Sequence, residues 1–410
     1  MKTTNNIPQG YKNSPLGIIP QEWEVKKLGD ITEINPSKEE VSSQFVTFLA
    51  MSDVSEHGGV IKENIVHKSS IKPGLTSFKR GDIIIAKITP CFENGKGALL
   101  NNITSEYGFG STEFHVIRYR QCNKFIYYHT MSYAFRKRLE SQMTGSAGQK
   151  RVPADSISSY KIPVPSLPEQ QKIAEILSTW DKAIEKQTQL IEKLELRKKG
   201  LMQQLLTGKK RLPGFGGEWK NIAIKDFAIE VSLKNNRNEN WEVLSCTKYD
   251  GLVPSLQYFG RQVFSKDITQ YKIVPQYCFA YATNHIEEGS IGYQSIYKNS
   301  LISPMYTVFK TDSNMIDDIF LYKLLKSHRA IYLYNVMMEG SIDRRGGLRW
   351  DNFSTIKFLL PDIKEQSAIA DILVSCDNEI LLAKQKLNKF RQQKKGLMQV
   401  LLTGKKRVNI

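Results

Sequence analysis

Residues 198–211, KKGLMQQLLTGKKR, return almost unchanged as KKGLMQVLLTGKKR at residues 394–407. The copies lie 196 positions apart, and at this offset residues 165–211 align with residues 361–407 without a gap. The same offset also pairs Glu22-Trp23 with Glu218-Trp219, Asp30 with Asp226, Val152 with Leu348, and Asp155 with Asp351. Repetition over this length indicates a duplicated unit, so we expect a tandem pair in which each half has a variable region followed by a repeated one.

The repeated region has the periodicity of a long helix. Its apolar residues recur at alternating steps of four and three, the spacing of a coiled-coil seam. The seam positions are Ile173, Leu177, Trp180, Ile184, Gln187, Ile191, Leu194, Lys198, Leu201 and Leu205 in the first copy, and Ile369, Leu373, Cys376, Ile380, Ala383, Leu387, Phe390, Lys394, Leu397 and Leu401 in the second. At the start of each helix, Ser166 with Glu169 and Asp362 with Glu365 have the spacing of a capping box. At the end, Gly208 and Gly404 suit the left-handed residue that follows a helix.

An apolar seam of this length needs a partner, and the second copy provides one in the same chain. We expect the two helices to pack on each other as an antiparallel coiled coil; the alternative is that each lies across its own domain. Gly200 and Gly396 disfavour helix at equivalent places. Either the Lys-Lys-Gly-Leu-Met segments contact another protein closely, or the helices end early, and the sequence leaves both interpretations open.

The composition favours a polyanionic partner. Lysine and arginine number 58 against 41 aspartates and glutamates, a formal net charge of +17, which attracts nucleic acid or an anionic membrane surface. The five cysteines include no CxxC pair and the six histidines are not at metal-ligand spacing, so we expect neither a disulfide framework nor a metal site. No signal peptide or membrane span is recognisable, which predicts a cytoplasmic protein without membrane contact.

The variable regions predict a mixed α+β fold. Residues 81–91 and 111–119 have the patterns of strands, and residues 125–143 have the period of an amphipathic helix. The second variable region repeats this order, with strands in residues 276–284 and 303–309 and a helix over residues 317–338.

Motifs for catalysis are missing from the sequence. We find no Asp/Asn-Pro-Pro-aromatic segment of an adenine methyltransferase, no GxxxxGK[ST] loop and no GxGxxG after a strand. The GFGG at residues 214–217 is interpreted as a flexible turn. Pro361-Asp362 with Glu365 resembles a nuclease pairing only faintly, because these residues also begin a helix. We therefore predict no catalytic residue in this chain.

Basic residues cluster at matching places near the ends of both variable regions. They are Arg136-Lys137-Arg138 and Lys150-Arg151 in the first, and Arg344-Arg345 and Arg349 in the second. Lysine and arginine bind phosphates whatever the base sequence. A charge cluster is often only a solvated face, but its repetition favours a shared role in contacting the DNA backbone.

The linker LTGKKRLPGFGGEW, the helix starts PSLPEQQKIAEIL and PDIKEQSAIADIL, and the segments AKITPCFENGKGAL, GSTEFHVIR, EEGSIGY and SPMYTVFK resemble the specificity subunit of Type I restriction-modification systems. The resemblance implies four segments. Residues 1–165 and 212–361 are target recognition domains that each read half of a bipartite DNA site, whereas residues 166–211 and 362–410 are spacer helices that dock two methyltransferase subunits. It also implies that restriction and translocation subunits join the complex. Adenine methylation, ATP use and cleavage, with S-adenosylmethionine, ATP and magnesium, then belong to those partners, and no cofactor is expected in this chain.

The family segments also nominate individual residues. For contact with double-stranded DNA they are Lys87, Thr89, Glu93, Asn94, Lys96, Ser111, Thr112, Lys150 and Arg151 in the first half, and His285, Ser290, Tyr293, Ser303, Tyr306, Arg344, Arg345 and Arg349 in the second. For docking of partner subunits they are Gln170, Lys199, Gly200, Leu201 and Met202, with Gln366, Lys395, Gly396, Leu397 and Met398. Each polar residue among the DNA candidates is also a common turn residue.

Two unlike recognition domains predict an asymmetric DNA site whose halves flank an unread gap. Domains that dock on one face of B-DNA lie about one helical turn apart, roughly 34–36 Å between their centres. Two other classes of function stay open from the sequence. One is a self-sufficient nuclease or methyltransferase, and the other is a basic coiled-coil scaffold for membranes or ribosomes.

Overall fold

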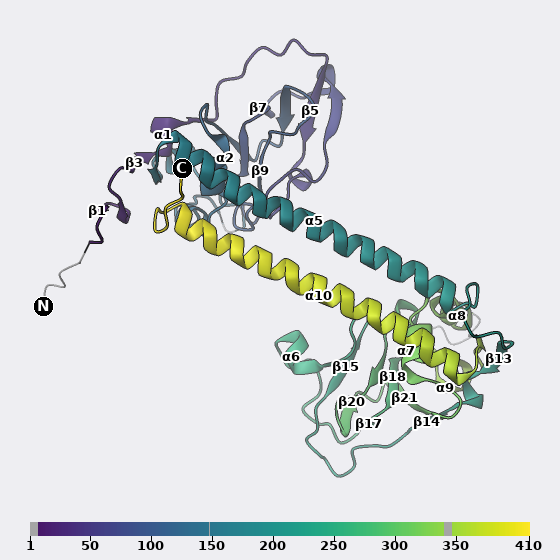
Figure 1. Cartoon of the computed structure of the whole chain (residues 1–410). Helices are drawn as coiled ribbons and strands as arrows, with labels where there is room; N and C mark the ends of the chain where they lie inside the picture. The colour runs from purple at the N-terminus through teal and green to yellow at the C-terminus, as the bar shows by residue number, and fades with distance from the viewer. Residues whose placement is uncertain (1–6, 147, 340–346) are drawn as a thin grey trace, which may run out of the picture. The chain divides into compact units, whose positions relative to one another are not determined.

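The computed structural model describes residues 7–146, 148–339 and 347–410. It divides into two compact units, which we call the first unit (residues 1–188 and 385–410) and the second unit (residues 189–384). Each unit contains a globular part and a length of both long helices, α5 (Leu167–Leu205) and α10 (Ile363–Leu401) (Figure 1). The predicted mixed α+β tandem repeat is confirmed.

The described residues of the first unit contain two four-stranded sheets, with strand orders β6-β5-β10-β7 and β4-β11-β8-β9. In the second of these sheets, β11 (Phe114–Arg118) pairs antiparallel with the fully buried β8 (Ile83–Ala86). The remaining elements are β1 (Tyr11–Ser14), β2 (Gly17–Pro20), β3 (Glu24–Lys27), α1 (Leu28–Ile31), β4 (Glu33–Ile34), β5 (Phe45–Leu49), β6 (Asn64–His67), β7 (Thr76–Lys79), β9 (Gly97–Leu99), β10 (Tyr107–Gly110), α2 (Asn123–Thr130), α3 (Tyr133–Glu140), α4 (Ala154–Ser158) and β12 (Lys161–Val164).

The described residues of the second unit form one four-stranded sheet, β14-β21-β18-β19, beside three two-stranded ones. Its central strands are the fully buried β18 (Cys278–Ala282) and β21 (Tyr306–Thr311), which pair antiparallel. The remaining elements are β13 (Lys220–Ala223), β14 (Ala228–Glu230), β15 (Leu244–Thr247), β16 (Gly251–Pro254), α6 (Ser255–Phe259), β17 (Lys272–Pro275), η4 (Ile286–Glu288), β19 (Ile291–Gln294), β20 (Asn299–Ile302), α7 (Asp318–Leu325), α8 (His328–Glu339), α9 (Trp350–Phe353) and β22 (Lys357–Leu360).

A short strand pair precedes each long helix, and this pair is duplicated. In the first unit β12 pairs antiparallel with β3, and the chain then enters α5. In the second unit β22 pairs with β13 in the same register, 196 residues further on, and the chain enters α10. The duplication therefore extends beyond the helices to the strands that hold their first turns.

Each unit contains an antiparallel pairing of the two helices. In the first unit Lys394 of α10 forms an ion pair with Asp181 of α5, and Trp180 packs edge-on against Phe390, with ring centroids 5.7 Å apart. In the second unit Lys198 forms an ion pair with Asp377, and Lys384 with Glu195 at 2.7 Å. Between the ion pairs Glu169–Arg407 and Asp181–Lys394 of the first unit, and between Glu195–Lys384 and Lys198–Asp377 of the second, the partner number falls as the α5 number rises. The predicted antiparallel arrangement is therefore confirmed within each unit.

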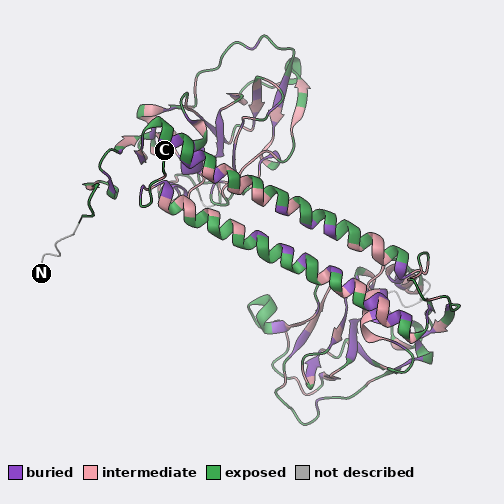
Figure 2. Cartoon of the chain, in the orientation of Figure 1, coloured by how far each residue is buried: buried purple, intermediate pink, exposed green. Residues whose placement is uncertain are grey.

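The predicted seam is the buried face of both helices (Figure 2). Ile173, Leu177, Ile191 and Leu194 are buried on α5, and the other predicted apolar seam positions are buried or half-buried. The two lysines that interrupt the seam, Lys198 and Lys394, form the ion pairs with the aspartates of the facing helix. A cation at a seam position is thus matched by an anion across it, which fixes the helix register.

Both long helices end as the sequence predicts. Gly208 and Gly404 have positive φ angles of 70° and 71°, the left-handed conformation that glycine adopts without strain. Gly404 also lies close to the first unit's N-terminal segment, where an added Cβ would come within 2.4 Å of Pro20 Cδ and 3.2 Å of Trp23 Cε3. At Gly404, glycine is therefore required both for the turn and for this close approach.

A buried carboxylate joins three parts of the chain in each unit. In the first unit Glu169, 1% exposed, accepts hydrogen bonds from Trp23 Nε1 at 3.0 Å and from Arg407 Nε at 2.6 Å. In the second unit Glu365 accepts the equivalent bonds from Trp219 Nε1 at 3.1 Å and Arg211 Nε at 2.7 Å. The sequence assigned both glutamates to capping boxes, and Asp362 Oδ1 does accept a hydrogen bond from Glu365 N at 3.0 Å. The glutamate carboxylates themselves, however, fasten the start of one long helix to the residues that follow the end of the other.

Two helices predicted as continuous are each divided in the structure. Residues 125–143 contain α2 and α3, and Ser132 between them accepts a hydrogen bond from Phe135 N at 3.2 Å as the N-cap of α3. Residues 317–338 contain α7 and α8, where Ser327 Oγ accepts from Ala330 N at 3.3 Å. A serine hydroxyl that satisfies the first amide groups of a helix allows a new helix to begin.

None of the described helices combines the length and the apolar composition that a membrane span requires.

Substitution of Arg407 by alanine should destabilise the first unit. The change leaves the buried Glu169 carboxylate without its bidentate partner, at a cost of about 3 kcal/mol, the low end for a broken buried pair because the guanidinium is partly exposed. Hydrogen exchange should accelerate in β3 and β12 and stay unchanged in β13 and β22. Lys406→Ala, an exposed neighbour, is the control, and Arg211→Ala should give the reverse pattern. Equal acceleration of exchange in both strand pairs would contradict the conclusion that Arg407 holds the start of α5 in the first unit alone.

Substitution of His129 by phenylalanine should reduce the acid sensitivity of the first unit. Burial lowers the pKa of His129 from 6.5 to about 3. Between pH 6.5 and pH 3 the unfolded chain therefore binds a proton at His129 that the folded unit does not bind. The stability that the neutral imidazole contributes is complete above pH 6.5 and is lost as the pH falls towards 3.

The measurement is the thermal unfolding midpoint between pH 7 and pH 4.5. His129→Phe keeps the edge-on packing against Phe125, whose ring centroid is 4.7 Å away, and should show a shallower decline than wild type. The control is substitution of His57, which is exposed. Parallel pH profiles for the wild type and His129→Phe would refute the prediction.

Candidate nucleic-acid interface and partner-docking segments

In the first unit three segments far apart in sequence lie side by side beyond the end of β8. Lys87 N donates to Glu113 O at 2.9 Å, Val152 N donates to Lys87 O at 2.9 Å, and Thr89 N donates to Lys150 O at 2.9 Å. These bonds bring together residues 87–96, 111–113, 144–146 and 148–151, which we call the first reading surface. It contains the predicted DNA contacts of this unit: Lys87, Thr89, Glu93, Asn94, Lys96, Ser111, Thr112, Lys150 and Arg151.

Several of these side chains already have partners within the protein. Arg151 forms a bidentate pair with Glu113, with Nη2 to Oε1 at 2.8 Å, and this hydrogen bond lowers the pKa of Glu113. Lys96 Nζ donates to Met51 O at 3.0 Å, and Asn94 Nδ2 donates to Glu56 Oε1 at 3.0 Å. Glu93 and Lys150 are exposed. Part of the first reading surface is therefore held in a fixed conformation before any ligand arrives.

The basic cluster Arg136-Lys137-Arg138 is not a uniform surface patch. Arg136 is 8% exposed, and its guanidinium donates to the carbonyl oxygens of Thr130 and Phe92 at 2.8 and 3.2 Å. Burial lowers the pKa of Arg136 to about 10. Lys137 pairs with Glu140 at 3.2 Å. The expected phosphate contact by Arg136 is therefore wrong, because its donors are already bound inside the unit.

The second unit builds an equivalent surface at the end of β18. Thr283, 196 positions after Lys87, accepts a hydrogen bond from Leu348 N at 2.8 Å, and its hydroxyl donates to Met305 O at 3.1 Å. Gly347 has a φ of 66°, and an added Cβ would lie 2.5 Å from Thr283 O. Residues 283–288, 303–306 and 347–349 thus form the second reading surface. It includes His285, Ser303, Tyr306 and Arg349; Arg344 and Arg345 lie outside the described residues.

Two predicted DNA contacts of the second unit, the buried Ser290 and the half-buried Tyr293, are used for contacts within the unit. Ser290 is 7% exposed, and its amide and carbonyl are bound to His285 O at 3.3 Å and Ala282 N at 3.0 Å. Tyr293 packs on Phe279 with ring centroids 4.8 Å apart, and its hydroxyl donates to Asp318 at 2.8 Å. Within EEGSIGY, residues 287–293, Glu287 and Glu288 belong to η4, and Ile291, Gly292 and Tyr293 belong to β19, which packs against α7.

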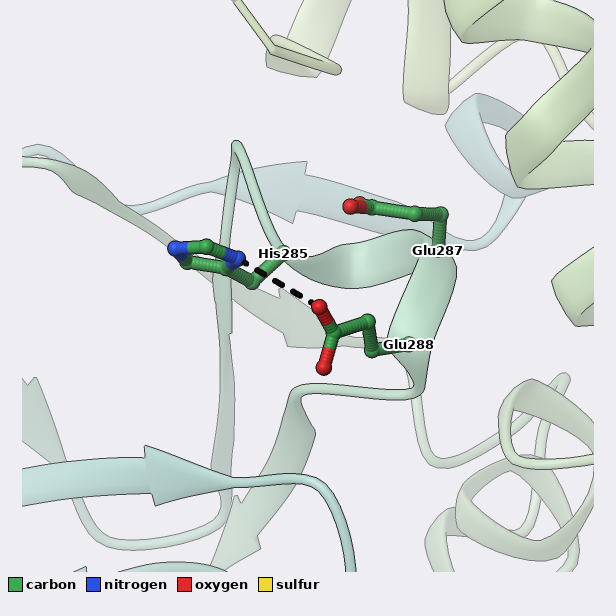
Figure 3. Close-up of side chains that lie close together, drawn as sticks. All are labelled: His285, Glu287 and Glu288. Carbon is green, nitrogen blue, oxygen red and sulfur yellow. Dashed lines mark ion pairs between the residues drawn. The ribbon is translucent and has the colours of Figure 1, made fainter.

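His285, Glu287 and Glu288 gather on the second reading surface (Figure 3). Their potential ligand atoms lie within 4.8 Å of one another, and His285 Nδ1 is 3.8 Å from Glu288 Oε1. The sequence did not suggest this grouping, because two adjacent glutamates near one histidine match no metal-binding spacing. Exposed groups of this kind are common on proteins without a metal, and we assign none.

Two residues predicted to dock partners have internal roles. Gln170 and Gln366 are 2% and 1% exposed. Their side-chain amides donate to Pro165 O and Pro361 O, each at 3.0 Å, and Gln366 Oε1 accepts from Asp317 N at 2.8 Å. The prediction of partner contacts at these two glutamines is therefore corrected: they fix the first turn of each long helix to the chain that precedes it.

The Lys-Lys-Gly-Leu-Met segments continue as helix to Leu205 and Leu401, so the alternative that the helices end early is excluded. A Cβ added at Gly200 or Gly396 would meet nothing within 4 Å. Nothing in the described ranges of the chain therefore requires glycine at these positions. The four apolar residues of these segments are half-buried: Leu201, Met202, Leu397 and Met398. Lys199 is exposed and lines a groove of the second unit. Lys395 Nζ lies over the Tyr133 ring, 5.6 Å from its centroid.

A groove of about 870 Å³ in the second unit is lined in part by the Lys-Lys-Gly-Leu-Met segment of α5, residues 198–202, which was predicted to dock a partner. Its apolar lining is Met202, Leu206, Leu324 and Ile380, and its cationic lining is Lys198, Lys199, Lys209, Lys326, Arg329 and Lys384. The acidic lining residues, Glu195 and Asp377, are each held by a lysine. The groove therefore presents an apolar floor with a positive rim.

The family of the chain follows from its sequence as well as from this duplicated architecture. Residues 20–196 and 217–392 each match the family described as the Type I restriction modification DNA specificity domain. The two matches cover most of the chain, and one falls on each half of the duplication. The chain belongs to this family.

Particular relatives share parts or all of the chain. It is 40% identical over 179 residues to the EcoAI specificity subunit of Escherichia coli, covering 42% of this chain and 30% of that protein. The match to the EcoEI specificity subunit covers 27% of that protein, so the chain spans less than a third of either relative. A putative specificity subunit named MjaX, from Methanocaldococcus jannaschii, is 25% identical over 98% of this chain and 97% of its own length.

Solved structures share the fold at low identity. A chain from a study of assembly and conformational transition of the type I R-M system aligns over 94% of this chain and 99% of its own, with a TM-score of 0.58 and 14% identity. A Type I restriction-modification S subunit from M. genitalium aligns over 98% of both chains, with a TM-score of 0.54 and 13% identity. These likenesses support the fold described above.

Proposed function

We propose that this chain is the non-catalytic DNA-specificity subunit of a Type I restriction-modification complex, and that each unit reads one half of an asymmetric DNA site. One observation carries the proposal: both DNA specificity domain matches coincide with a scaffold repeated at an offset of 196, on which the reading surfaces differ. Lys87 and Thr283 occupy equivalent backbone positions with different side chains. A shared scaffold with unlike surfaces suits recognition of two unlike half-sites.

Phosphate contacts supply most of the affinity in this proposal. The net charge of +17 favours DNA, and Lys150 and Arg349 are exposed on the two reading surfaces. Arg151 is the less direct candidate, because its pairing with Glu113 must be exchanged for a phosphate contact. Base discrimination then falls to the polar side chains of the loops, among them Glu93 and Asn94.

The chemistry belongs to other subunits. We assign adenine methylation with S-adenosylmethionine to two methyltransferase subunits, and ATP-dependent translocation and magnesium-dependent cleavage to restriction subunits. The sequence offers no motif for these reactions, which supports the division of labour. The docking segments support it further: two half-buried Leu-Met pairs on α5 and α10, at equivalent positions, match two equivalent partners.

The docking groove of the second unit suggests what its partner presents. Six lysines and arginines line it against two acidic residues, and its floor is apolar. An acidic amphipathic helix satisfies both features, because its apolar face covers the floor while its carboxylates meet the rim.

Methylome sequencing tests the proposal directly. A host that expresses the chain with its partner subunits should acquire methylated adenines in one bipartite, asymmetric motif, and the host without this chain should not. Methylation or cleavage of DNA by the purified chain alone would contradict the non-catalytic assignment. A continuous motif without an unread gap would contradict two-part recognition.

Lys150→Ala should weaken DNA binding without changing the preferred sequence. The loss of one phosphate contact should make the slope of log affinity against log salt shallower by about one. The measurement is fluorescence anisotropy of the assembled complex on cognate and scrambled duplexes across a salt series. Lys161→Ala, on the scaffold strand β12, is the control. An unchanged slope, or a loss confined to the cognate duplex, would refute a backbone contact.

Gly200 tests partner docking without disturbing the fold. Because a Cβ meets open space there and alanine favours helix by about 1 kcal/mol, Gly200→Ala should not reduce the stability of the isolated chain. Gly200→Leu should weaken the affinity for the methyltransferase subunit by roughly tenfold or more if the partner's backbone approaches the helix, a cost of about 1.4 kcal/mol. Lys186→Leu, an exposed site on the same helix, is the control for adding an apolar side chain. Unchanged affinity would contradict docking at this segment.

A further inference from the structure

Arg136 places its guanidinium beneath the loop that carries two candidate base contacts. The loop comprises residues 91–96, between β8 and β9. Nη1 of Arg136 donates to Phe92 O at 3.2 Å, and Nη2 donates to Gly95 O and Lys96 O, each at 3.4 Å. These carbonyls lie on either side of Glu93 and Asn94, the two exposed residues of the loop.

The same guanidinium is fixed from the other side. Its Nε donates to Thr130 O at 2.8 Å, at the end of α2, and its Cζ lies over the Phe92 ring, 4.7 Å from the ring centroid. Arg136 itself belongs to α3, whose first turn begins after the Ser132 cap. One side chain thus connects the junction of α2 and α3 to the backbone of the loop.

A buried cation tolerates little displacement. A charged group that leaves water must keep its hydrogen-bond partners, because an unsatisfied buried donor is costly. The planar guanidinium holds its N–H groups in a fixed fork, so the carbonyls that accept from it are fixed in position as well. Gly97 leaves the required room, since an added Cβ would lie 3.1 Å from Arg136 Nη2 and 2.9 Å from Ile84 O.

We infer that Arg136 is a positioning residue for sequence recognition: it never touches DNA, but it sets the geometry with which Glu93 and Asn94 meet the bases of one half-site. This inference rests on the proposed function. A carboxylate accepts from the amino group of cytosine, and an amide pairs with adenine, only when the backbone presents them at the right depth. A loosened loop keeps both side chains but loses the discrimination.

The second unit anchors its corresponding loop by different means, which supplies an internal control. There the residue that points into the unit is Ile286 of η4, fully buried in the apolar core beside α8. Gly289, at the end of η4, approaches Ile331 of α8, with an added Cβ 3.7 Å from Ile331 Cδ1. A change at Arg136 therefore leaves the packing of the second reading surface intact.

The test compares methylomes from hosts that express the assembled complex with wild-type chain, Arg136→Met, Arg136→Lys or Lys124→Met. Lys124 is an exposed cation of the neighbouring helix α2, outside the candidate DNA contacts, and serves as the matched control. We expect Arg136→Met to lose discrimination by about tenfold or more at one or two base positions of a single half-site. Arg136→Lys should give an intermediate loss, because an ammonium group cannot bridge all the carbonyls.

The outcomes separate recognition from folding. A wild-type motif that is methylated less often throughout, without new degenerate positions, would show that Arg136 only stabilises the fold. Degeneracy in both half-sites, or an unchanged motif with Arg136→Met, would likewise overturn the inference. If Arg136→Met fails to accumulate, Arg136→Lys and hydrogen exchange of residues 91–96 in that variant decide the question. Absence of any bipartite motif with the wild-type chain would instead refute the proposed function.

Discussion

A buried carboxylate at the start of each long helix is the constraint on which both units depend. Glu169 and Glu365 are nearly inaccessible to water, and each receives an indole N–H from its own unit's N-terminal segment and a guanidinium from the residues after the other long helix. An anion in such a place is stable only when all three parts of the chain meet. Because Arg407 and Arg211 follow α10 and α5, neither unit is complete until both helices have formed and paired.

The network around each buried glutamate distinguishes the repeated parts of the two units from the parts that differ. The strand pairs β3–β12 and β13–β22, the helix starts and the Thr-Gly-Lys-Lys-Arg ends share one geometry, because each contributes to the same network around the carboxylate. The loops at the ends of β8 and β18 take no part in it. They are free to differ in length and chemistry, and they do: the first is held by a buried arginine, the second by a buried isoleucine.

The candidate site was predictable only in outline. Family segments located the loops, and hydrogen bonds between Lys87, Glu113 and Val152 do bring the predicted residues of the first unit together. Residue types alone could not distinguish a polar group on the surface from one used internally. Gln170, Gln366, Ser290 and Tyr293 were nominated for binding, yet all are used for internal contacts. Charge misled in the same way at Arg136, whose buried carbonyl partners come from segments distant in sequence.

The order of residues was enough to predict the duplication and the long helices with their seam and glycine ends, and it contains no recognisable catalytic motif. These properties follow from local periodicity and repetition, which are readable one residue at a time. The burial of Glu169 and Glu365, the pairing of the seam lysines with aspartates, and the exposure of the cations that can meet a ligand became visible only in the folded chain. Each of these depends on the desolvation of a charged group by residues far away in the chain, and no local pattern records that cost.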